Sequence, residues 1–465
     1  MTGTALDARE RAAIDAVPAQ LLVDGVWRDA TGGGVLAVED PSTGDELCVV
    51  ADATPEDGLA ALDAAARAQV RWAAHPPRER GEVLRRAHDA LVRRADELAL
   101  VMTLEMGKPI AESRAEVLYS ADFLRWFSEE AVRIDGRYTV GPGGGDRLLV
   151  LRQPVGPCVL VTPWNFPMAM GARKIAPAVA AGCAMVVKPA HQTPLSMLAL
   201  ARTLEEAGLP PGVLNVVPTT DADRLVSPLL RDPRTRKLSF TGSTAVGARL
   251  ASAAASRMLR VSMELGGNAP FVVFEDADLE AAVDGAVVAK MRNTGEACTA
   301  ANRFLVAERV AEDFVARLAA RLAAMRVGRG TDPGSQVGPL IDEAARHRVA
   351  RLVGDAVARG ARTVAGGAAI EGPGHFYAPT VLAGVPPESR VLHEEVFGPV
   401  APVTTFATDA EAIAAANSTD AGLVAYVFTR DIDRALRVVE ALEVGMVGLN
   451  QGMVSNAAAP FGGVK

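Results

Sequence analysis

The stretch CVLVTPWNFPMAMGARKIAPAVAAGCAMVVK, residues 158–188, decides the fold of this chain. It contains a short apolar run at 158–162, a segment whose apolar side chains have helical spacing, and a second apolar run at 184–188. Apolar strands separated by helices are typical of βαβ units around a parallel sheet. The same alternation continues to further strands at 213–217 and 237–241. The sequence therefore predicts an α/β domain around this stretch.

The segments on either side extend this organisation. Residues 54–99 and 112–133 have helical spacing, whereas the glycine-rich segment 136–147 and the extended segment 148–152 predict a protruding arm or a domain boundary. After residue 263 the α/β alternation begins again. The expected elements are strands at 271–274, 304–306, 400–406, 424–429 and 447–450 and helices at 278–292 and 310–326. The sequence therefore predicts a second α/β domain.

The composition excludes several classes of protein. The 465 residues include 49% hydrophobic and 22% charged side chains, which is typical of globular proteins. The net charge is −8 without a dense Lys/Arg stripe, so nucleic acid is not an expected partner. The longest apolar stretch, 175–187, is shorter than the ~20 residues of a membrane helix. Residues 1–11 lack an apolar secretory segment, and the four cysteines form no CxxC pair or Cys/His cluster, which predicts a cytoplasmic protein without a metal site.

Cys298 lies in RNTGEACTA, residues 292–300, directly after a predicted helix. A cysteine in a loop is better placed for nucleophilic attack than a cysteine in the core. Cys48, Cys158 and Cys183 lie in apolar runs and are expected to be small buried side chains. The same interpretation stays open for Cys298.

Two other polar side chains follow predicted strands. Glu264 comes after the run at 260–263 and precedes two glycines, which suits a general base, although a solvated glutamate is the alternative. Asn165 follows the strand at 158–162, where its amide would stabilise an oxyanion, although a structural turn is the alternative.

Gly242 and Ser243 lie between a predicted strand and a predicted helix. Backbone N–H groups at a helix N-terminus bind phosphate, but glycine and serine are also common helix caps. The usual dinucleotide motif GxGxxG is absent from the first βα turn, so these two residues are the candidate phosphate cradle.

The order and spacing of these motifs resemble those of the NAD(P)-dependent aldehyde dehydrogenases, from about Leu21 to Lys465. The motifs are TPWNFP at 162–167, KPA at 188–190, FTGST at 240–244, ELGG at 264–267, GEAC at 295–298, EVFGP at 395–399 and PFGG at 460–463. The resemblance implies a Rossmann-like cofactor domain at 1–134 and 152–262, an oligomerisation arm at 135–151, an α/β catalytic domain at 263–450 and a return segment at 451–465. The family continues beyond this last segment with a tail that pairs with the arm of another subunit, so a homodimer or homotetramer is expected when the tail is present.

The resemblance also implies catalytic roles. Cys298 would attack the aldehyde to form a thiohemiacetal, while the Asn165 amide and the backbone N–H of Cys298 stabilise its oxyanion. Glu264 would activate the water that hydrolyses the thioester. Lys174 matches a helix lysine that helps proton transfer, and a surface lysine is the alternative. The residues expected to contact the cofactor are Trp164, Lys188, Ala190, His191, Gly242, Ser243, Leu265, Glu395 and Phe397.

Within the family, the chain resembles most the succinate-semialdehyde dehydrogenases. The motifs are ARK at 172–174, MRN at 291–293, CTAANR at 298–303 and GMVSN at 452–456. Arg173, Arg292 and Ser455 match residues that bind the distal carboxylate of the substrate, and guanidinium groups suit a planar carboxylate. The resemblance implies oxidation of succinate semialdehyde to succinate. The alternatives are glutarate semialdehyde or another short aldehyde, a CoA-dependent acylating reaction and a non-catalytic family member.

Three positions depart from the family pattern. Members that prefer NAD often have glutamate at the position of His191; its absence and a protonated His191 beside Lys188 favour NADP, with NAD still usable. Glu296 replaces the usual glutamine, and a carboxylate there would raise the pKa of the nucleophile unless the side chain points away. Ala300 replaces a second cysteine, so no local disulfide with Cys298 is expected.

Overall fold

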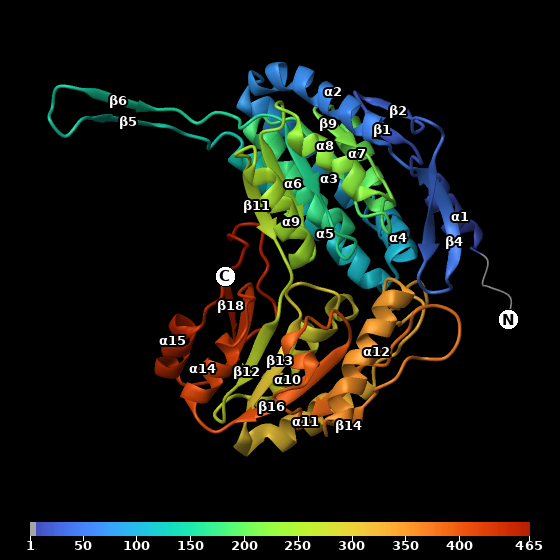
Figure 1. Cartoon of the computed structure of the whole chain (residues 1–465), viewed down its shortest axis with the longest axis vertical. Coiled ribbons are helices and arrows are strands. Elements are labelled where there is room, and N and C mark those ends of the chain that lie inside the picture. The colour runs from blue at the N-terminus through green and yellow to red at the C-terminus, as the bar shows by residue number, and fades with distance from the viewer. Residues whose placement is uncertain (1–5) are drawn as a thin grey trace.

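The computed structural model describes residues 6–465, which form two lobes, each built around a seven-stranded sheet (Figure 1). Residues 1–5, part of the segment from which the absence of a secretory signal is predicted, lie outside the described residues. The sheet of the first lobe has the order β11-β10-β7-β8-β9-β1-β2. Its strands are β1 (Leu21–Val23), β2 (Val26–Arg28), β7 (Cys158–Val161), β8 (Met185–Lys188), β9 (Leu214–Val216), β10 (Lys237–Thr241) and β11 (Arg260–Glu264).

Strands β7 to β11 run parallel, and the strand order reverses between β7 and β10. The connecting helices are α6 (Pro167–Ala181), α7 (Leu195–Glu206), α8 (Ala222–Arg231) and α9 (Thr244–Ala255). Open α/β sheets bind ligands at the carboxyl ends of their strands where the order reverses. The segments that follow β7 and β10 therefore lie at the expected ligand edge.

The other elements of the first lobe precede β7. They are the helices α1 (Ala8–Asp15), α2 (Pro55–Ala73), α3 (Pro77–Arg93), α4 (Ala95–Met106) and α5 (Ile110–Glu130) and the hairpin of β3 (Val35–Asp40) with β4 (Asp45–Ala51). Helix α5 packs against α3, α4 and α6. This packing brings α5 next to the segment that begins with Trp164 and Asn165.

The apolar stretch 175–187 is divided between two elements of the core. Helix α6 ends at Gly182, which has the left-handed φ of 81° that favours glycine, and strand β8 follows. Ile175, Val179 and Val186 are completely buried. Among the described residues, no helix combines the length and the apolar character that crossing a membrane requires.

The second lobe confirms the second α/β domain. Its sheet has the order β14-β15-β16-β13-β12-β17-β18, and all neighbours are parallel except β14 and β15. The strands are β12 (Ala269–Val273), β13 (Ala301–Ala307), β14 (Arg362–Ala365), β15 (Thr380–Ala383), β16 (Val400–Phe406), β17 (Val424–Phe428) and β18 (Met446–Leu449). The helices are α10 (Leu279–Met291), the 3-10 turn η1 (Arg292–Gly295), α11 (Glu308–Ala323), α12 (Glu343–Ala358), α13 (Arg390–His393), α14 (Asp409–Asn417) and α15 (Ile432–Ala441). The sequence prediction omits β14 and β15, whose four residues each are too few to show a period, and it also omits α12 to α15.

The segment 136–152 forms an arm, which is one of the two structures that the sequence predicts for it; the other is a domain boundary. Strands β5 (Arg137–Val140) and β6 (Arg147–Val150) pair antiparallel into a hairpin that projects from the first lobe (Figure 1). Tyr138, Leu149 and Leu151 are each 67% exposed on it. The hairpin therefore presents apolar side chains that this chain does not cover.

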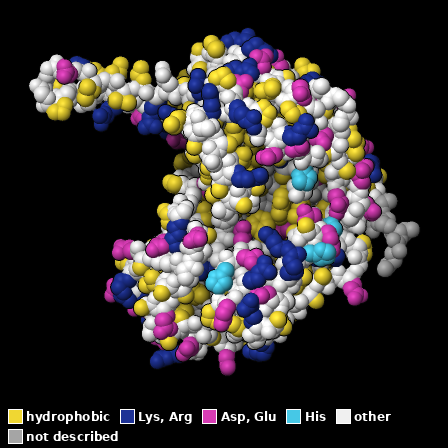
Figure 2. All heavy atoms as spheres, viewed as in Figure 1, with side chains coloured by type: hydrophobic (Ala, Val, Ile, Leu, Met, Phe, Trp, Pro, Cys, Tyr) yellow, Lys and Arg dark blue, Asp and Glu magenta, His cyan; other side chains and the backbone are white. Residues whose placement is uncertain are grey.

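The carboxyl edge of the first sheet faces the amino ends of strands in the second. Strand β11 ends at Glu264 and β12 begins at Ala269, so only residues 265–268 join the two sheets. A Cβ atom on Gly267 would lie 2.3 Å from the carbonyl oxygen of Cys298, which shows how closely this link approaches the nucleophile. The surface is hollowed between the two lobes (Figure 2).

Candidate active site

Cys298 follows a backbone turn of unusual conformation. Asn293 and Thr294 both have φ of 56° and Gly295 has φ of 79°, a left-handed region that non-glycine residues rarely adopt. The N–H of Asn293 donates to Oε2 of Glu112, and the hydroxyl of Tyr426 donates to the carbonyl of Thr299 at 2.8 Å. These contacts hold residues 292–299, which we call the nucleophile loop, and present Cys298 as a partly buried loop side chain.

Burial and the nearby charge of Glu395 raise the pKa of the Cys298 thiol to about 12, and Glu264 adds to the increase. The charges of Arg173 and Arg292 act in the opposite direction. A thiol with this pKa forms little thiolate near neutral pH, so its attack requires a base that removes the proton.

The side chain of Glu296 points away from the nucleophile. Its Oε1 accepts from the N–H of Ile341 at 3.1 Å, and its other carboxyl oxygen is buried without a hydrogen-bond partner. Burial raises the pKa of Glu296 well above its usual value, because the charged carboxylate loses its hydration, and the hydrogen bond from Ile341 opposes this change. In this orientation the replacement of glutamine by Glu296 adds no charge beside Cys298.

Asn165 is fixed to the nucleophile loop by hydrogen bonds. Its Nδ2 donates to the backbone carbonyl of Glu296 at 2.9 Å, and the backbone carbonyl of Asn165 accepts from Nδ2 of Asn293 at 3.0 Å. An amide has two N–H bonds, so one donor of Asn165 is left after the contact with Glu296. The structure thus brings together the proposed oxyanion donor and the segment that contains the nucleophile.

A buried ion pair supports this arrangement from α5. Nζ of Lys108 lies 2.6 Å from Oε2 of Glu116 and 2.7 Å from the carbonyl of Asn165, and both charged side chains are 1% exposed. The other carboxylate oxygen of Glu116 accepts from the N–H groups of Met168 and Ala169 in the first turn of α6. Sequence reasoning missed this pair because nothing local distinguishes it from the charges of an exposed helix.

Glu264 and Lys174 interact as titratable groups. Nζ of Lys174 donates to Oγ of Ser239 at 2.9 Å in a buried position, so the surface position considered for this lysine is wrong. Burial lowers the pKa of Lys174 to about 7, and the charge of Glu264 opposes this change. Burial also raises the pKa of Glu264, while Lys174 and Arg173 lower it. Both groups therefore have pKa values shifted toward neutrality, as proton transfer requires.

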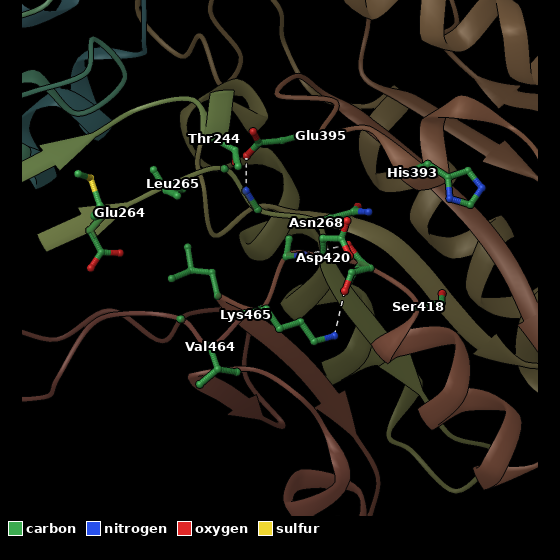
Figure 3. A pocket seen from close by; sticks show the side chains of 18 residues that line it. Thr244, Glu264, Leu265, Asn268, His393, Glu395, Ser418, Asp420, Val464 and Lys465 are labelled. Atoms are coloured by element: carbon green, nitrogen blue, oxygen red, sulfur yellow. Dashed lines mark hydrogen bonds between the residues drawn. The ribbon is translucent and has the colours of Figure 1, made fainter. Parts of the chain in front are cut away.

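Glu264 and Glu395 line a pocket of about 590 Å³, which we call the glutamate pocket (Figure 3). Residues 264–268, His393, Glu395, 418–423 and 463–465 form its wall together with Thr244 and Met263. Oε1 of Glu395 accepts from the N–H of Gly267 at 2.9 Å. Burial raises the pKa of Glu395 to about 7.

A second cavity, of about 410 Å³, adjoins the nucleophile loop from the side of α5. We call it the arginine pocket; its wall includes Tyr119, Phe166, Arg292 and Ser455. The guanidinium of Arg292 lies 4.6 Å above the ring of Phe166. Nη2 of Arg173 donates to Oγ of Ser455 at 3.0 Å. The structure thus brings together the three residues predicted to bind a carboxylate.

Neither arginine has a carboxylate partner within residues 6–465. The guanidinium of Arg292 makes no hydrogen bond to any of these residues, and Nε of Arg173 is buried without a partner. A buried donor without an acceptor is unfavourable by about 1–3 kcal/mol. The pocket therefore offers donors that an anionic ligand would satisfy.

Lys188 and His191 lie together at the carboxyl end of β8. Lys188 is buried, burial lowers its pKa to about 8, and its ammonium has no hydrogen-bond partner among the described residues. Partial burial and the charge of Lys188 lower the pKa of His191. A protonated His191, one of the two grounds for expecting NADP, is therefore disfavoured.

The first turn of α9 fits a phosphate group. Ser243 occupies the cap position, but its side chain makes no hydrogen bond to the turn, so the N–H groups are left for another acceptor. A Cβ on Gly242 would lie 2.6 Å from the ring of Phe240, so only glycine fits there.

Aromatic residues provide a wall near Glu395. The rings of Trp164 and Phe397 meet edge to face at 5.3 Å, and Phe397 has a left-handed φ of 51°. Strained backbone of this kind clusters at ligand sites. Leu265 packs against Gly247, and Ala190 is buried beside Lys188. The residues expected to contact NAD(P) thus provide a phosphate cradle, an unpaired cation and a flat apolar wall, which fit a dinucleotide.

Several residues of the site carry no recognisable motif. Tyr119 bonds to both Arg173 and Ser455, and Arg348 donates to the carbonyl next to Glu395. Only the packing of distant segments reveals them. In the described part of the chain, no group of three or more His, Cys, Asp or Glu side chains is arranged to hold a metal ion.

Comparison with known proteins places this site in a family. The family model described as aldehyde dehydrogenase family matches residues 27–465. A succinate-semialdehyde dehydrogenase from Paenarthrobacter nicotinovorans is 61% identical over 419 residues, which cover 90% of this chain and 93% of that protein. A glutarate-semialdehyde dehydrogenase from Pseudomonas aeruginosa is 47% identical over 446 residues, which cover 96% of this chain and 92% of that protein. The crystal structure of an NADP-dependent enzyme from E. coli has a TM-score of 0.96 at 46% identity and covers 97% of this chain and 94% of that one. The chain belongs to the aldehyde dehydrogenase family.

Proposed function

We propose that this protein oxidises succinate semialdehyde to succinate with reduction of NAD(P). The observation that carries the substrate assignment is the pair of guanidinium groups, Arg173 and Arg292, that have no carboxylate partner among the described residues. Arg292 lines the arginine pocket, and Arg173 bonds to Tyr119 and Ser455 in its wall. Two fixed positive charges with free planar donors match the distal carboxylate of a short semialdehyde. The name of the relative that is 61% identical agrees with this substrate.

The residues of this chain divide the reaction between them. Glu264, whose pKa burial raises, accepts a proton so that the Cys298 sulfur can attack the aldehyde carbon. The remaining N–H of the Asn165 amide and the backbone N–H of Cys298 stabilise the oxyanion of the thiohemiacetal. When bound, NAD(P) supplies the acceptor for the two electrons that leave the aldehyde carbon. Glu264 then accepts a proton from the water molecule that attacks the Cys298 thioester and hydrolyses it. Lys174 exchanges protons with Glu264.

The cofactor is held at the carboxyl edge of the first sheet. Gly242 and Ser243 bind the pyrophosphate, Lys188 and Glu395 bind the riboses, and Trp164, Leu265 and Phe397 flank the nicotinamide. We assign NADP as the preferred cofactor because His191 stands where members of the family that prefer NAD often have a glutamate, so the carboxylate that would repel a phosphate on the adenosine ribose is absent from that position. The positive charge for that phosphate comes from Lys188.

The length of the semialdehyde is the nearest alternative. A relative at 47% identity is named for glutarate semialdehyde, which has one more methylene. An apolar pocket discriminates one methylene by only about 1–3 kcal/mol. Both substrates place a carboxylate at Arg173 and Arg292, so the arginine pocket accepts either.

The test compares initial rates with succinate semialdehyde, glutarate semialdehyde and butanal, each with NADP and with NAD, followed by the absorbance of the reduced nicotinamide. We expect both carboxylated aldehydes to exceed butanal in kcat/KM by about 10-fold or more, because a charge-assisted hydrogen bond contributes about 1.5–3 kcal/mol. Equal values for butanal would remove the carboxylate pocket but keep the dehydrogenase. A kcat/KM that is much higher with NAD than with NADP would overturn the cofactor preference.

The arm suggests how the chain assembles. We propose a homodimer or homotetramer in which the hairpin of β5 and β6 is covered by another copy, since Tyr138, Leu149 and Leu151 are each 67% exposed. We assign residues 1–134 and 152–262 to the cofactor-binding domain, 135–151 to the arm, 263–450 to the catalytic domain and 451–465 to the return segment. Four free cysteines suit a reducing compartment such as the cytoplasm. Analytical ultracentrifugation of the protein tests the assembly, and a monomer at micromolar concentration would contradict it.

A further inference from the structure

Tyr119 lies at the centre of the donors in the arginine pocket. Its hydroxyl accepts from Nη2 of Arg173 at 2.5 Å and also bonds to Oγ of Ser455. These three residues come from α5, from α6 and from the segment after β18, so the phenol joins parts of the chain that are far apart in sequence. Its ring packs edge to face on Phe123 at 4.8 Å, which fixes the direction of the hydroxyl.

The guanidinium of Arg173 is enclosed by aromatic rings. Its carbon atom lies 4.0 Å from the ring centre of Phe461, 4.9 Å from that of Phe123 and 5.8 Å from that of Tyr119. The aromatic faces attract the guanidinium cation, but this attraction does not fix how the guanidinium plane is rotated relative to the rings. Hydrogen bonds from Nη2 to Tyr119 and to Ser455 set that rotation, and Nε is left without a partner.

The hydroxyl hydrogens of Tyr119 and Ser455 are not both used within this cluster. Arg173 only donates, so the oxygens of Tyr119 and Ser455 both accept from it. The two hydroxyl groups carry two hydrogens between them, and their mutual bond uses one. The second hydroxyl hydrogen is available beside the free donors of Arg173. The cluster thus presents an O–H to the arginine pocket, next to the guanidinium of Arg173 that is bonded to both hydroxyl groups.

We propose that Tyr119 is a specificity-determining residue that positions Arg173 and Ser455 for the distal carboxylate of the substrate. The inference rests on the proposed function and deepens it, because it names what turns an unpaired arginine into an oriented carboxylate site. Tyr119 does not touch the reacting atoms, so it selects between aldehydes with and without a carboxylate and leaves the chemistry at Cys298 unchanged.

The test is Tyr119→Phe, which removes one oxygen atom and keeps the ring packing on Phe123. We expect kcat/KM for succinate semialdehyde to fall by about 10-fold to 100-fold, mainly through KM, because a charge-assisted network loses its central acceptor. The value for butanal should change by less than about 2-fold, so the ratio of the two values decreases. The inhibition constant of succinate should rise in parallel, which measures carboxylate binding without turnover.

Ser120→Ala is the matched control. This neighbouring hydroxyl on α5 is buried and donates only to the carbonyl of Glu116 within its own helix, at 2.8 Å. We expect the ratio of succinate semialdehyde to butanal to stay at the value of the parent protein. Thermal unfolding of both variants shows whether either substitution disturbs the fold.

The outcomes separate this proposal from the proposed function. If the parent protein prefers succinate semialdehyde and Tyr119→Phe keeps the same preference, Tyr119 has no part in selection and the proposal fails alone. An equal decrease for both aldehydes assigns the hydroxyl a structural role and also overturns it. If the parent protein oxidises butanal and succinate semialdehyde with equal kcat/KM, the proposed substrate and the role of Tyr119 fail together.

Discussion

The arginine pocket and the glutamate pocket both adjoin the nucleophile loop, but their charges are of different kinds. Arg173 and Arg292 carry guanidinium groups, which stay charged in proteins and have no carboxylate partner among the described residues. In the glutamate pocket, burial raises the pKa of Glu264 and raises that of Glu395 to about 7. Burial lowers the pKa of Lys174, whose charge acts on Glu264 from outside the pocket wall, to about 7. Charge is permanent in the first pocket and exchangeable in the second.

The difference indicates a division of labour. A permanent positive charge suits the binding of an anion, because no proton can leave and abolish it. Groups that titrate near neutral pH suit proton transfer, because each protonation state is accessible at little energetic cost. Lys174 is also a cation, but a pKa of about 7 makes it a weak competitor for the substrate carboxylate. Substitutions that remove one kind of charge at a time therefore test the comparison.

Among substitutions at Glu264, Arg292, Lys174 and Glu296, Glu264→Gln should have the largest effect, because it removes the base of the glutamate pocket. We expect steady-state turnover to fall by about 100-fold or more. A burst of reduced cofactor equal to one per site should remain, but it should form more slowly than in the parent protein because Glu264 also accepts the proton of Cys298; stopped-flow absorbance measures its amplitude and its rate. Unchanged turnover would exclude Glu264 as the hydrolytic base.

Arg292→Met should lower kcat/KM for succinate semialdehyde by about 10-fold to 100-fold and leave that for butanal nearly unchanged. The methionine keeps the contact with Phe166 but has no donor or charge. Arg292→Lys keeps the charge without the planar fork, so its value should lie between those of the parent and of the methionine variant. A similar decrease for butanal would show that Arg292 acts on the nucleophile instead of the carboxylate.

Lys174→Met should change the pH profile more than the maximal rate. The charge of Lys174 lowers the pKa of Glu264, so its removal raises that pKa further. Glu264 is then deprotonated only at higher pH, and the acidic limb of kcat should move upward by about one pH unit. Rates measured from pH 5 to pH 10 test this shift. A limb that moves to lower pH would contradict the pairing of Lys174 with Glu264.

Glu296→Gln should have the smallest effect on activity, below about 2-fold, because Glu296 faces Ile341 instead of Cys298. Its effect on stability depends on pH. Burial raises the pKa of Glu296 above the value of about 4.3 in an unfolded chain, so the protonated acid supports folding at low pH and this support is lost as the pH rises.

The neutral amide of Glu296→Gln does not ionise, so the variant does not lose this stability as the pH rises. The midpoint of thermal unfolding of Glu296→Gln should therefore exceed that of the parent protein by about 2 °C or more at pH 8 and approach it near pH 4.5. A marked change in the acidic limb of activity would show that Glu296 does act on the nucleophile.

The parts of the fold and the site that the sequence predicts depend on short stretches of chain. The alternation at 158–188 predicts the parallel sheet because each strand and helix shows its own period. Asn165 follows β7 and Glu264 is the last residue of β11, and the carboxyl ends of parallel strands lie at one edge wherever those strands are in the sequence. The sequence therefore predicts that these side chains lie together at that edge of the sheet.

The residues that sequence reasoning missed depend on packing between distant segments. Tyr119 and Lys108 reach the site because α5 and the segment before it pack against α6, and no local pattern records that contact. Burial is equally invisible in a sequence. It places Lys174 inside the protein and lowers the pKa of His191, against the surface position considered for the first and the protonation expected for the second.

A crystal structure of Cys298→Ala with succinate semialdehyde tests the division between the two pockets most directly. The account predicts the substrate carboxylate in the arginine pocket, with guanidinium nitrogens of Arg173 and Arg292 about 2.7–2.9 Å from its oxygens, and the aldehyde carbon beside Ala at position 298. A substrate carboxylate bound in the glutamate pocket, with both arginines still unpaired, would contradict it.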